Sequence, residues 1–267
     1  MGFPGSWMSE SGALVYRVVP KAACSTIGQV LHHADHGRWY DGDIHDAEAG
    51  ILKWNQEDAR PRIAETIEQG RAPVFTFVRN PYARVLSAFF DKVAGIQRNG
   101  RRYRAGTLPE ALAKYGIDPE AEDFDQVRAF RRFLLFVRDT IRMRKPMDPD
   151  IHWSAQAGHV GTIIRGGGRY ALIAPMEKLT EGLEQVYALA PLSDPPALDA
   201  LPRFNEGAAG GRRREHPLED FFDDLSTFIV QDVYRRDFRL FGYDTDPGDG
   251  PPVRPIDLDF IHEKLGR

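Results

Sequence analysis

Charged, small and hydroxyl side chains gather in the heptapeptide PKAACST at residues 20–26. An apolar run precedes it at residues 13–19, and apolar residues at positions 27, 30 and 31 follow at helical spacing. The heptapeptide is therefore predicted to be a tight turn between a strand and a helix, where backbone N–H groups converge on one spot. Such a turn suits an anion, most often a phosphate-type group. It is not a Walker A loop, because the pattern G-x-x-x-x-G-K-[ST] does not occur in the sequence.

A second segment, FVRNPYARVLSAF at residues 77–89, could hold another anionic group. Arg79 follows a predicted buried strand at residues 73–78, so it emerges at the same sheet edge as Lys21 if the two strands are parallel. Its guanidinium suits a bidentate grip on a phosphate. Ser87 lies two helical turns further along the chain. Neither residue alone would indicate a site, but the two segments together predict a ligand with two anionic groups.

Strands that alternate with helices predict an α/β fold with a central parallel sheet, flanking helices and a ligand at the carboxyl ends of the strands. The predicted strands are residues 13–19, 73–78 and 170–174. The predicted helices are residues 55–70, a helix from Pro81 with Asn80 as its N-cap, and residues 124–143, 176–189 and 217–240.

The rest of the chain is expected to form loops around a single domain that spans residues 1–267, with its core at about residues 13–243. Residues 95–120, 145–169 and 191–217 read as irregular segments, and residues 244–267 as a loosely ordered or surface-wrapping tail. Six apolar residues of the last predicted helix are expected to face the core, namely Leu218, Phe221, Phe222, Leu225, Phe228 and Ile229.

Composition and charge limit the classes of protein to which this chain can belong. The hydrophobic content of 42% and charged content of 28% are those of a globular protein, and the net charge of −4 disfavours nonspecific nucleic-acid binding. The single Cys24 excludes an intrachain disulfide framework and fits a reducing compartment. No signal peptide or long apolar run is evident, so we expect a cytoplasmic protein without a membrane span. The oligomeric state cannot be read from the sequence.

Taken together, the two anion-binding segments resemble the PAPS-dependent sulfotransferases, where PAPS is 3′-phosphoadenosine 5′-phosphosulfate. The similarity is closest to the carbohydrate branch, sulfotransferase family 2, which includes chondroitin and dermatan enzymes. It continues with Ile44-His45, with IHWSAQ at residues 151–156 and with VYRRDFRLFGY at residues 233–243. The resemblance implies a three-layer, P-loop-like sulfotransferase fold.

The resemblance also implies roles by position. The residues that would bind the 5′-phosphosulfate are Lys21, Ala22, Ala23, Cys24, Ser25 and Thr26. Lys21 would also stabilise charge on the bridging oxygen as the sulfuryl group leaves. Arg79 and Ser87 would hold the 3′-phosphate, with Arg213 as the candidate for a further contact among Arg212, Arg213 and Arg214. No metal is expected.

Transfer to a hydroxyl needs a base near the acceptor oxygen, and histidine has a suitable pKa. His45 lies between the two cofactor segments, where related enzymes often place their base, and His152 is the second candidate. A carboxylate, Asp46 or Glu48, is the third possibility.

The acceptor is expected to be a hydroxyl of a carbohydrate or glycoconjugate, contacted by the loops at residues 95–120 and 145–168. Two other hypotheses stay open from the residues. The first is a kinase-like phosphotransferase that binds ATP with Mg²⁺ at the same turn. The second is a non-catalytic module that binds anions or nucleic acid through the arginine clusters, and the acidic balance disfavours it.

Overall fold

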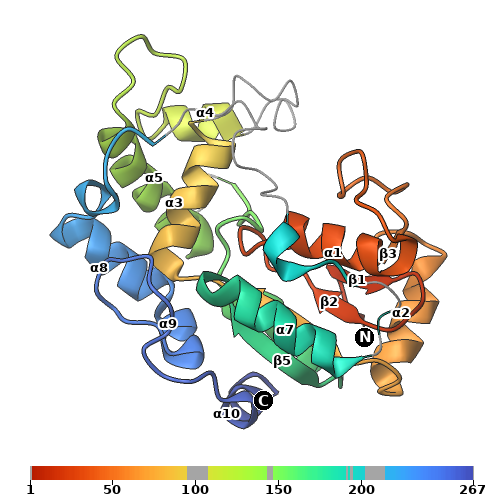
Figure 1. Cartoon of the computed structure of the whole chain (residues 1–267). Helices are drawn as coiled ribbons and strands as arrows, with labels where there is room; N and C mark the ends of the chain where they lie inside the picture. Colours follow the sequence, from red (N-terminus) through yellow and green to blue (C-terminus); the bar gives the residue numbers. More distant parts are fainter. Residues whose placement is uncertain are drawn as a thin grey trace. The chain divides into compact units, whose positions relative to one another are not determined.

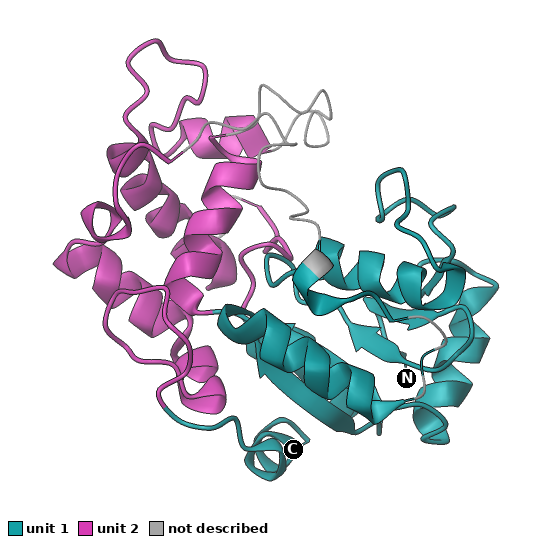
Figure 2. Cartoon of the chain, viewed as in Figure 1, with its two compact units in different colours: residues 1–79, 156–204, 254–267 teal, residues 80–155, 205–253 magenta. Residues whose placement is uncertain are grey.

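The computed structural model describes residues 2–94, 108–142, 147–190, 192, 195–201 and 214–266. They form two compact units, coloured separately in Figure 2. Unit 1 comprises Met1–Arg79, Gln156–Phe204 and Arg254–Arg267, and unit 2 comprises Asn80–Ala155 and Asn205–Val253. The first crossing between the units falls directly after Arg79, where the predicted strand gives way to a helix. That the whole chain acts as one domain stays a prediction.

Unit 1 is built on a five-stranded sheet with the order β3-β1-β2-β4-β5 (Figure 1). Its strands are β1 (Ser6–Ser9), β2 (Val15–Arg17), β3 (Ile51–Lys53), β4 (Val74–Val78) and β5 (Tyr170–Pro175). β2, β4 and β5 pair in parallel, whereas β1 pairs antiparallel with both β2 and β3. The predicted parallel sheet is therefore correct for three strands and wrong for β1. The sequence pattern does not indicate β1 or β3, because segments of four and three residues are too short to show strand periodicity.

Helices contact both faces of this sheet. α1 (Cys24–His36) and α7 (Leu179–Leu189) pack over Tyr16, Phe75 and Phe77 in one apolar core. Arg17 points the other way, because neighbouring residues of a strand face opposite sides. There the buried Arg17 Nε donates to the Thr162 hydroxyl of α6 at 2.7 Å. The helices associated with this second face are α2 (Ala59–Glu68), α6 (Gln156–Arg165) and α10 (Leu258–Leu265); the 3-10 turns of unit 1 are Met176–Lys178 and Leu198–Ala200.

Three segments that the sequence predicts to be irregular contain α-helices. The stretch at residues 95–120 includes α4 (Leu108–Ala113), the stretch at residues 145–169 includes α6, and the tail ends in α10. α10 forms because Asp257 caps it, with its carboxylate accepting from the Phe260 N–H at 3.0 Å, and because Ile261 and Leu265 are buried. A helix of eight residues after a Pro- and Gly-rich stretch is stabilised by this docking more than by its propensity.

The docking of α10 on β5 depends on an uncharged histidine. His262 Nε2 accepts from the Tyr170 N–H at 3.2 Å, and burial, reinforced by Arg169, lowers the pKa of His262 although Asp259 opposes the shift. Because the unfolded state then binds the proton more readily, this contribution is complete above the ordinary histidine pKa of about 6.5 and is lost as the pH falls below it. We expect the amides of α10 to exchange with deuterium severalfold faster at acid pH, after correction for intrinsic rates. His262→Gln keeps an acceptor oxygen but does not titrate, so an equal acid response in that variant would contradict the assignment.

Unit 2 is helical in its described part. Its helices are α3 (Pro81–Lys92), α4 (Leu108–Ala113), α5 (Gln126–Ile141), the 3-10 turn Leu218–Phe221, α8 (Asp224–Val233) and α9 (Arg235–Phe241). The start of α3 is as predicted, with Pro81 at its first position and the Asn80 side chain accepting from the Tyr82 N–H at 3.0 Å.

The single long helix predicted at residues 217–240 is wrong, since the structure divides it into a 3-10 turn, α8 and α9. Asp223 starts α8 afresh by accepting from the Ser226 N–H at 2.8 Å. Only part of the predicted apolar stripe therefore faces the core. Phe221, Phe222 and Ile229 are buried, whereas Leu225 and Phe228 are 58% and 63% exposed.

Candidate functional site

The turn between β2 and α1 adopts a backbone conformation that its residue types disfavour. Lys21 and Ala23 have φ values of 68° and 62°, in the left-handed region that glycine favours, and Ala22 between them is fully buried. Each such residue costs on the order of 1–3 kcal/mol, and strain of this kind concentrates at functional sites. The predicted order of strand, turn and helix is confirmed, with one correction: Cys24, Ser25 and Thr26 form the first turn of α1 rather than the loop before it.

The N-terminus of α1 is left open to an anion. The first N–H groups of a helix have no carbonyl four residues earlier within that helix to bond to. Among the described residues no side chain caps α1, and its first turn carries no acidic residue. The helix dipole, the Lys21 charge and the hydroxyls of Ser25 and Thr26 therefore add at one end of the helix without a carboxylate of that turn to offset them.

Arg79 lies at the same edge of the sheet as Lys21, as predicted. β2 and β4 are parallel neighbours, and Arg79 follows directly after β4. Its guanidinium Nη1 donates to the Lys21 carbonyl oxygen at 3.2 Å. The Arg79 guanidinium is thus held against the backbone of the turn within unit 1.

His45 meets the first turn of α1. Its Nε2 lies 3.1 Å from Ser25 Oγ, and its ring stands edge-to-face with that of Trp7 at 5.2 Å between centroids. The His45 N–H donates to the Asp43 carboxylate at 3.0 Å. An exposed imidazole is thereby placed beside the hydroxyls of the turn, where it could accept a proton from a substrate.

The loop that carries His45 is anchored by residues that sequence reasoning missed. The ammonium of Lys53, only 2% exposed, donates to the Asp46 carbonyl and lies 5.5 Å from the centroid of the Trp7 ring. Burial lowers the pKa of Lys53, and the nearby carboxylate of Asp46 opposes that shift. Gln56 Nε2 donates to the Ala47 carbonyl at 2.9 Å. A lysine in a three-residue strand gives no sequence signal of such a role.

Gly28 allows the His45 loop to approach α1. A Cβ at this position would lie 2.8 Å from Ile44 Cγ1 and 2.8 Å from Trp7 Cζ3. Both neighbours are buried, so neither can move cheaply. The glycine in an otherwise regular helix was the available sequence signal for this close approach.

Cys24 is a poor nucleophile. Burial raises the pKa of its thiol, and Lys21 only partly opposes that shift. Tyr16 beneath it is fully buried, and burial, together with the proximity of Cys24, also raises the pKa of its phenol. A thiol kept protonated suits a structural part in the turn.

Ser87 and His152 belong to unit 2. Ser87 is half-buried on α3. His152 Nδ1 lies 2.6 Å from the Asp150 carboxylate. The buried Arg84 holds this segment from α3, with Nη1 donating to the Ser154 carbonyl at 2.7 Å. His152 thus has an acidic partner that could orient it, whereas His45 has the turn hydroxyl.

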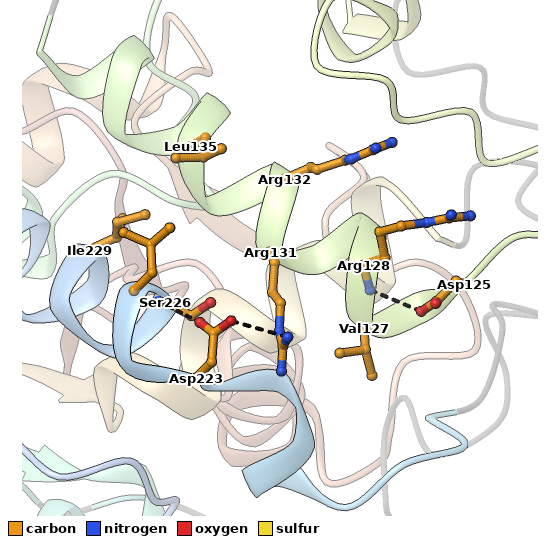
Figure 3. A pocket seen from close by; sticks show the side chains of 10 residues that line it. Asp125, Val127, Arg128, Arg131, Arg132, Leu135, Asp223, Ser226 and Ile229 are labelled. Carbon is orange, nitrogen blue, oxygen red and sulfur yellow. Dashed lines mark hydrogen bonds and ion pairs between the residues drawn. The ribbon is translucent and has the colours of Figure 1, made fainter.

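A shallow pocket of about 280 Å³ in unit 2 gathers three arginines of α5 (Figure 3). Arg131 points to Asp223, with its Nη1 at 3.1 Å from the carboxylate, while Arg128 and Arg132 extend away from α8 in this view. Arg132 Nη1 donates to the Gly116 carbonyl at 2.6 Å. The pocket therefore uses part of its charge in local contacts. Arg213, the predicted phosphate contact, and Arg212 lie outside the described residues, whereas Arg214, the third arginine considered, is exposed.

The described residues contain no group of three or more His, Cys, Asp or Glu side chains that could hold a metal ion. Within the same residues, none of the helices has the length and apolarity needed to cross a membrane.

Comparison with known proteins gives one match. The model of the sulfotransferase family matches residues 4–244. No curated protein and no solved structure matches the chain. Since the family match covers the strained turn, Arg79 and both candidate bases, and most of the chain's length, the chain belongs to the sulfotransferase family and is an enzyme of the class predicted from its sequence, a PAPS-dependent sulfotransferase.

Proposed function

We propose that this chain transfers the sulfuryl group of PAPS to a hydroxyl of a carbohydrate or glycoconjugate. The observation that carries the proposal is the contact of the Arg79 guanidinium with the Lys21 carbonyl, beside the open end of α1. It supports two anion-binding groups at one sheet edge, which is what a nucleotide with a 5′-phosphosulfate and a 3′-phosphate requires. The strand, strained turn and helix are the P-loop-like part of a three-layer sulfotransferase fold in this proposal.

The 5′-phosphosulfate is assigned to the turn and the first turn of α1. The N–H groups of residues 23–26 and the hydroxyls of Ser25 and Thr26 supply donors, and the left-handed backbone conformations of Lys21 and Ala23 shape the turn that presents them. Arg79 holds the 3′-phosphate. Ser87 and Arg213 stay predicted contacts of that phosphate.

The chemical step forms one bond to sulfur and breaks another. The acceptor hydroxyl oxygen attacks the sulfur, its proton passes to His45 Nε2, and the bond from sulfur to the bridging oxygen of the 5′-phosphate breaks. Lys21 stabilises the negative charge that this oxygen gains. In the unliganded chain His45 Nε2 is hydrogen-bonded to Ser25 Oγ, and a phosphosulfate that engages this hydroxyl would release the imidazole toward the acceptor.

Binding of adenosine 3′,5′-bisphosphate, the desulfonated donor, tests the proposal. Wild-type protein should bind it in calorimetry, and Arg79→Ala should bind it at least about tenfold more weakly, since a charge-assisted hydrogen bond contributes about 1.5–3 kcal/mol. Arg79→Lys keeps the charge but loses the planar fork, so it should fall between the two. No binding by the wild type, or undiminished binding by Arg79→Ala, would rule the assignment out.

Radiolabelled PAPS tests the acceptor class. Label should pass to a carbohydrate-bearing acceptor from a host extract, and label found only on a lipid or small aromatic product would replace the carbohydrate in the proposal.

A further inference from the structure

The side chain of Gln156 makes two hydrogen bonds to the backbone of Arg79. Gln156 Oε1 accepts from the Arg79 N–H at 2.8 Å, and Gln156 Nε2 donates to the Arg79 carbonyl at 2.7 Å. Gln156 is the first residue of α6 and is fully buried. Both residues belong to unit 1.

Neither neighbour of β4 in the sheet pairs with Arg79, so the Gln156 side chain takes the place of a strand there. The pairing of β4 with β5 ends at Val78 opposite Pro175, which has no N–H to donate. The pairing of β4 with β2 ends earlier, at Phe75 opposite Tyr16. The peptide groups of Arg79 therefore lie beyond the sheet, and the amide of Gln156 supplies the donor and the acceptor that a neighbouring backbone would have offered.

Because the peptide groups on both sides of the Arg79 Cα are held, the direction in which its side chain leaves the backbone is also fixed. The guanidinium then reaches the Lys21 carbonyl at 3.2 Å, at the strained turn. A side chain of this length that both donates and accepts must be glutamine: ionised glutamate has no donor, and asparagine is one methylene shorter.

We propose that Gln156 is a positioning residue for donor recognition, which aims Arg79 at the 3′-phosphate by holding both its N–H and its carbonyl group. This inference rests on the proposed function, because it takes the 3′-phosphate as the group that Arg79 binds. It assigns Gln156 no contact with the ligand. Its effect should therefore appear in the preference for a nucleotide with a 3′-phosphate over one without it.

The test compares adenosine 3′,5′-bisphosphate with adenosine 5′-phosphate in calorimetry. Gln156→Glu leaves the Arg79 carbonyl without a donor, so we expect its preference for the bisphosphate to fall about tenfold at about pH 7.5. Burial raises the pKa of a carboxyl group, so the protonated fraction of the carboxyl introduced by Gln156→Glu, which has an O–H donor again, grows as the pH falls to about 5.5. The preference of this variant should then recover relative to wild type at the same pH.

Gln29 offers a matched control. It is 4% exposed and holds the Tyr40 backbone in the same way, with Nε2 donating to the carbonyl at 3.0 Å and Oε1 accepting from the N–H at 2.9 Å. Gln29→Glu should therefore lower the melting temperature comparably while the preference for the bisphosphate stays at the wild-type value.

The outcomes separate the two proposals. If wild type does not bind the bisphosphate, the proposed function fails. If wild type binds it and Gln156→Met, which has no donor at any pH, keeps the full preference or loses affinity for both nucleotides by the same factor, the positioning role is overturned. Should Gln156→Glu fail to fold, Gln156→Met has similar volume without charge, and it should show the same loss with no recovery at acid pH.

Discussion

Replacing Lys21 by methionine is expected to lower kcat by about 10²–10³-fold, while affinity for adenosine 3′,5′-bisphosphate falls much less. The reason is that the lysine charge acts mainly on the bridging oxygen, which becomes fully negative only as the bond to sulfur breaks. Methionine keeps the unbranched length of the side chain and therefore the packing of the turn. Transfer from labelled PAPS, measured under saturating donor, gives kcat directly.

Two further variants at this position separate charge from backbone conformation. Lys21→Arg keeps a positive charge but changes its geometry, so it should retain more activity than Lys21→Met. Lys21→Gly removes the charge and also relieves the left-handed conformation at φ 68°, so its melting temperature should exceed that of Lys21→Met despite the same loss of transfer.

The result that would contradict the assignment is a loss confined to the KM for PAPS, with kcat unchanged. Lys21 would then bind ground state and transition state equally and would be a binding residue only. Equal destabilisation by Lys21→Gly and Lys21→Met would separately show that the turn is not strained enough to matter.

The anion-binding turn was predictable because its determinants are local. A buried strand, a short run of small and hydroxyl residues and an amphipathic helix are adjacent in sequence, so periodicity alone brings Lys21 to the N-terminus of α1. Arg79 was predictable for a similar reason: it ends a buried strand, and parallel strands deliver their carboxyl ends to one edge.

The support of the site was not predictable, because it depends on pairing between distant short segments. Lys53 reaches the His45 loop only because β3 pairs with β1, and Trp7 contacts His45 only because β1 joins the sheet between β3 and β2. Neither strand has a pattern long enough to be recognised. Gln156 likewise has no local signal, since its partner lies 77 residues earlier in the chain.

The helical prediction at residues 217–240 failed for a different reason. Apolar spacing persisted across Asp223, although an aspartate followed three residues later by Ser226 can start a new helix by capping it. The exposed Phe228 shows that periodicity identifies a helix more securely than it identifies the buried face.

His45→Gln is expected to lower kcat by about 10²–10⁴-fold, the contribution of a positioned general base, with binding of adenosine 3′,5′-bisphosphate nearly unchanged. Glutamine can still hydrogen-bond to Ser25 Oγ, so the loop should stay in place and the loss should reflect proton transfer. In wild type, kcat should fall as the pH drops through the pKa of the base, and this acid limb should disappear in His45→Gln. Added imidazole should restore part of the activity of His45→Ala.

Gly28→Ala tests the position of His45 independently of its chemistry, because it leaves the imidazole intact. Its Cβ would press on Ile44 and Trp7 and push His45 away from the turn, so kcat should fall while the acid limb of the pH profile persists. His152→Ala should retain most of the wild-type rate. If His152→Ala instead removes the acid limb and His45→Gln leaves it, the base is His152 with Asp150 as its orienting partner. If both variants keep the limb, the proton goes to a carboxylate such as Asp46 or Glu48, and the contact of His45 with Ser25 serves only to order the turn before the donor binds.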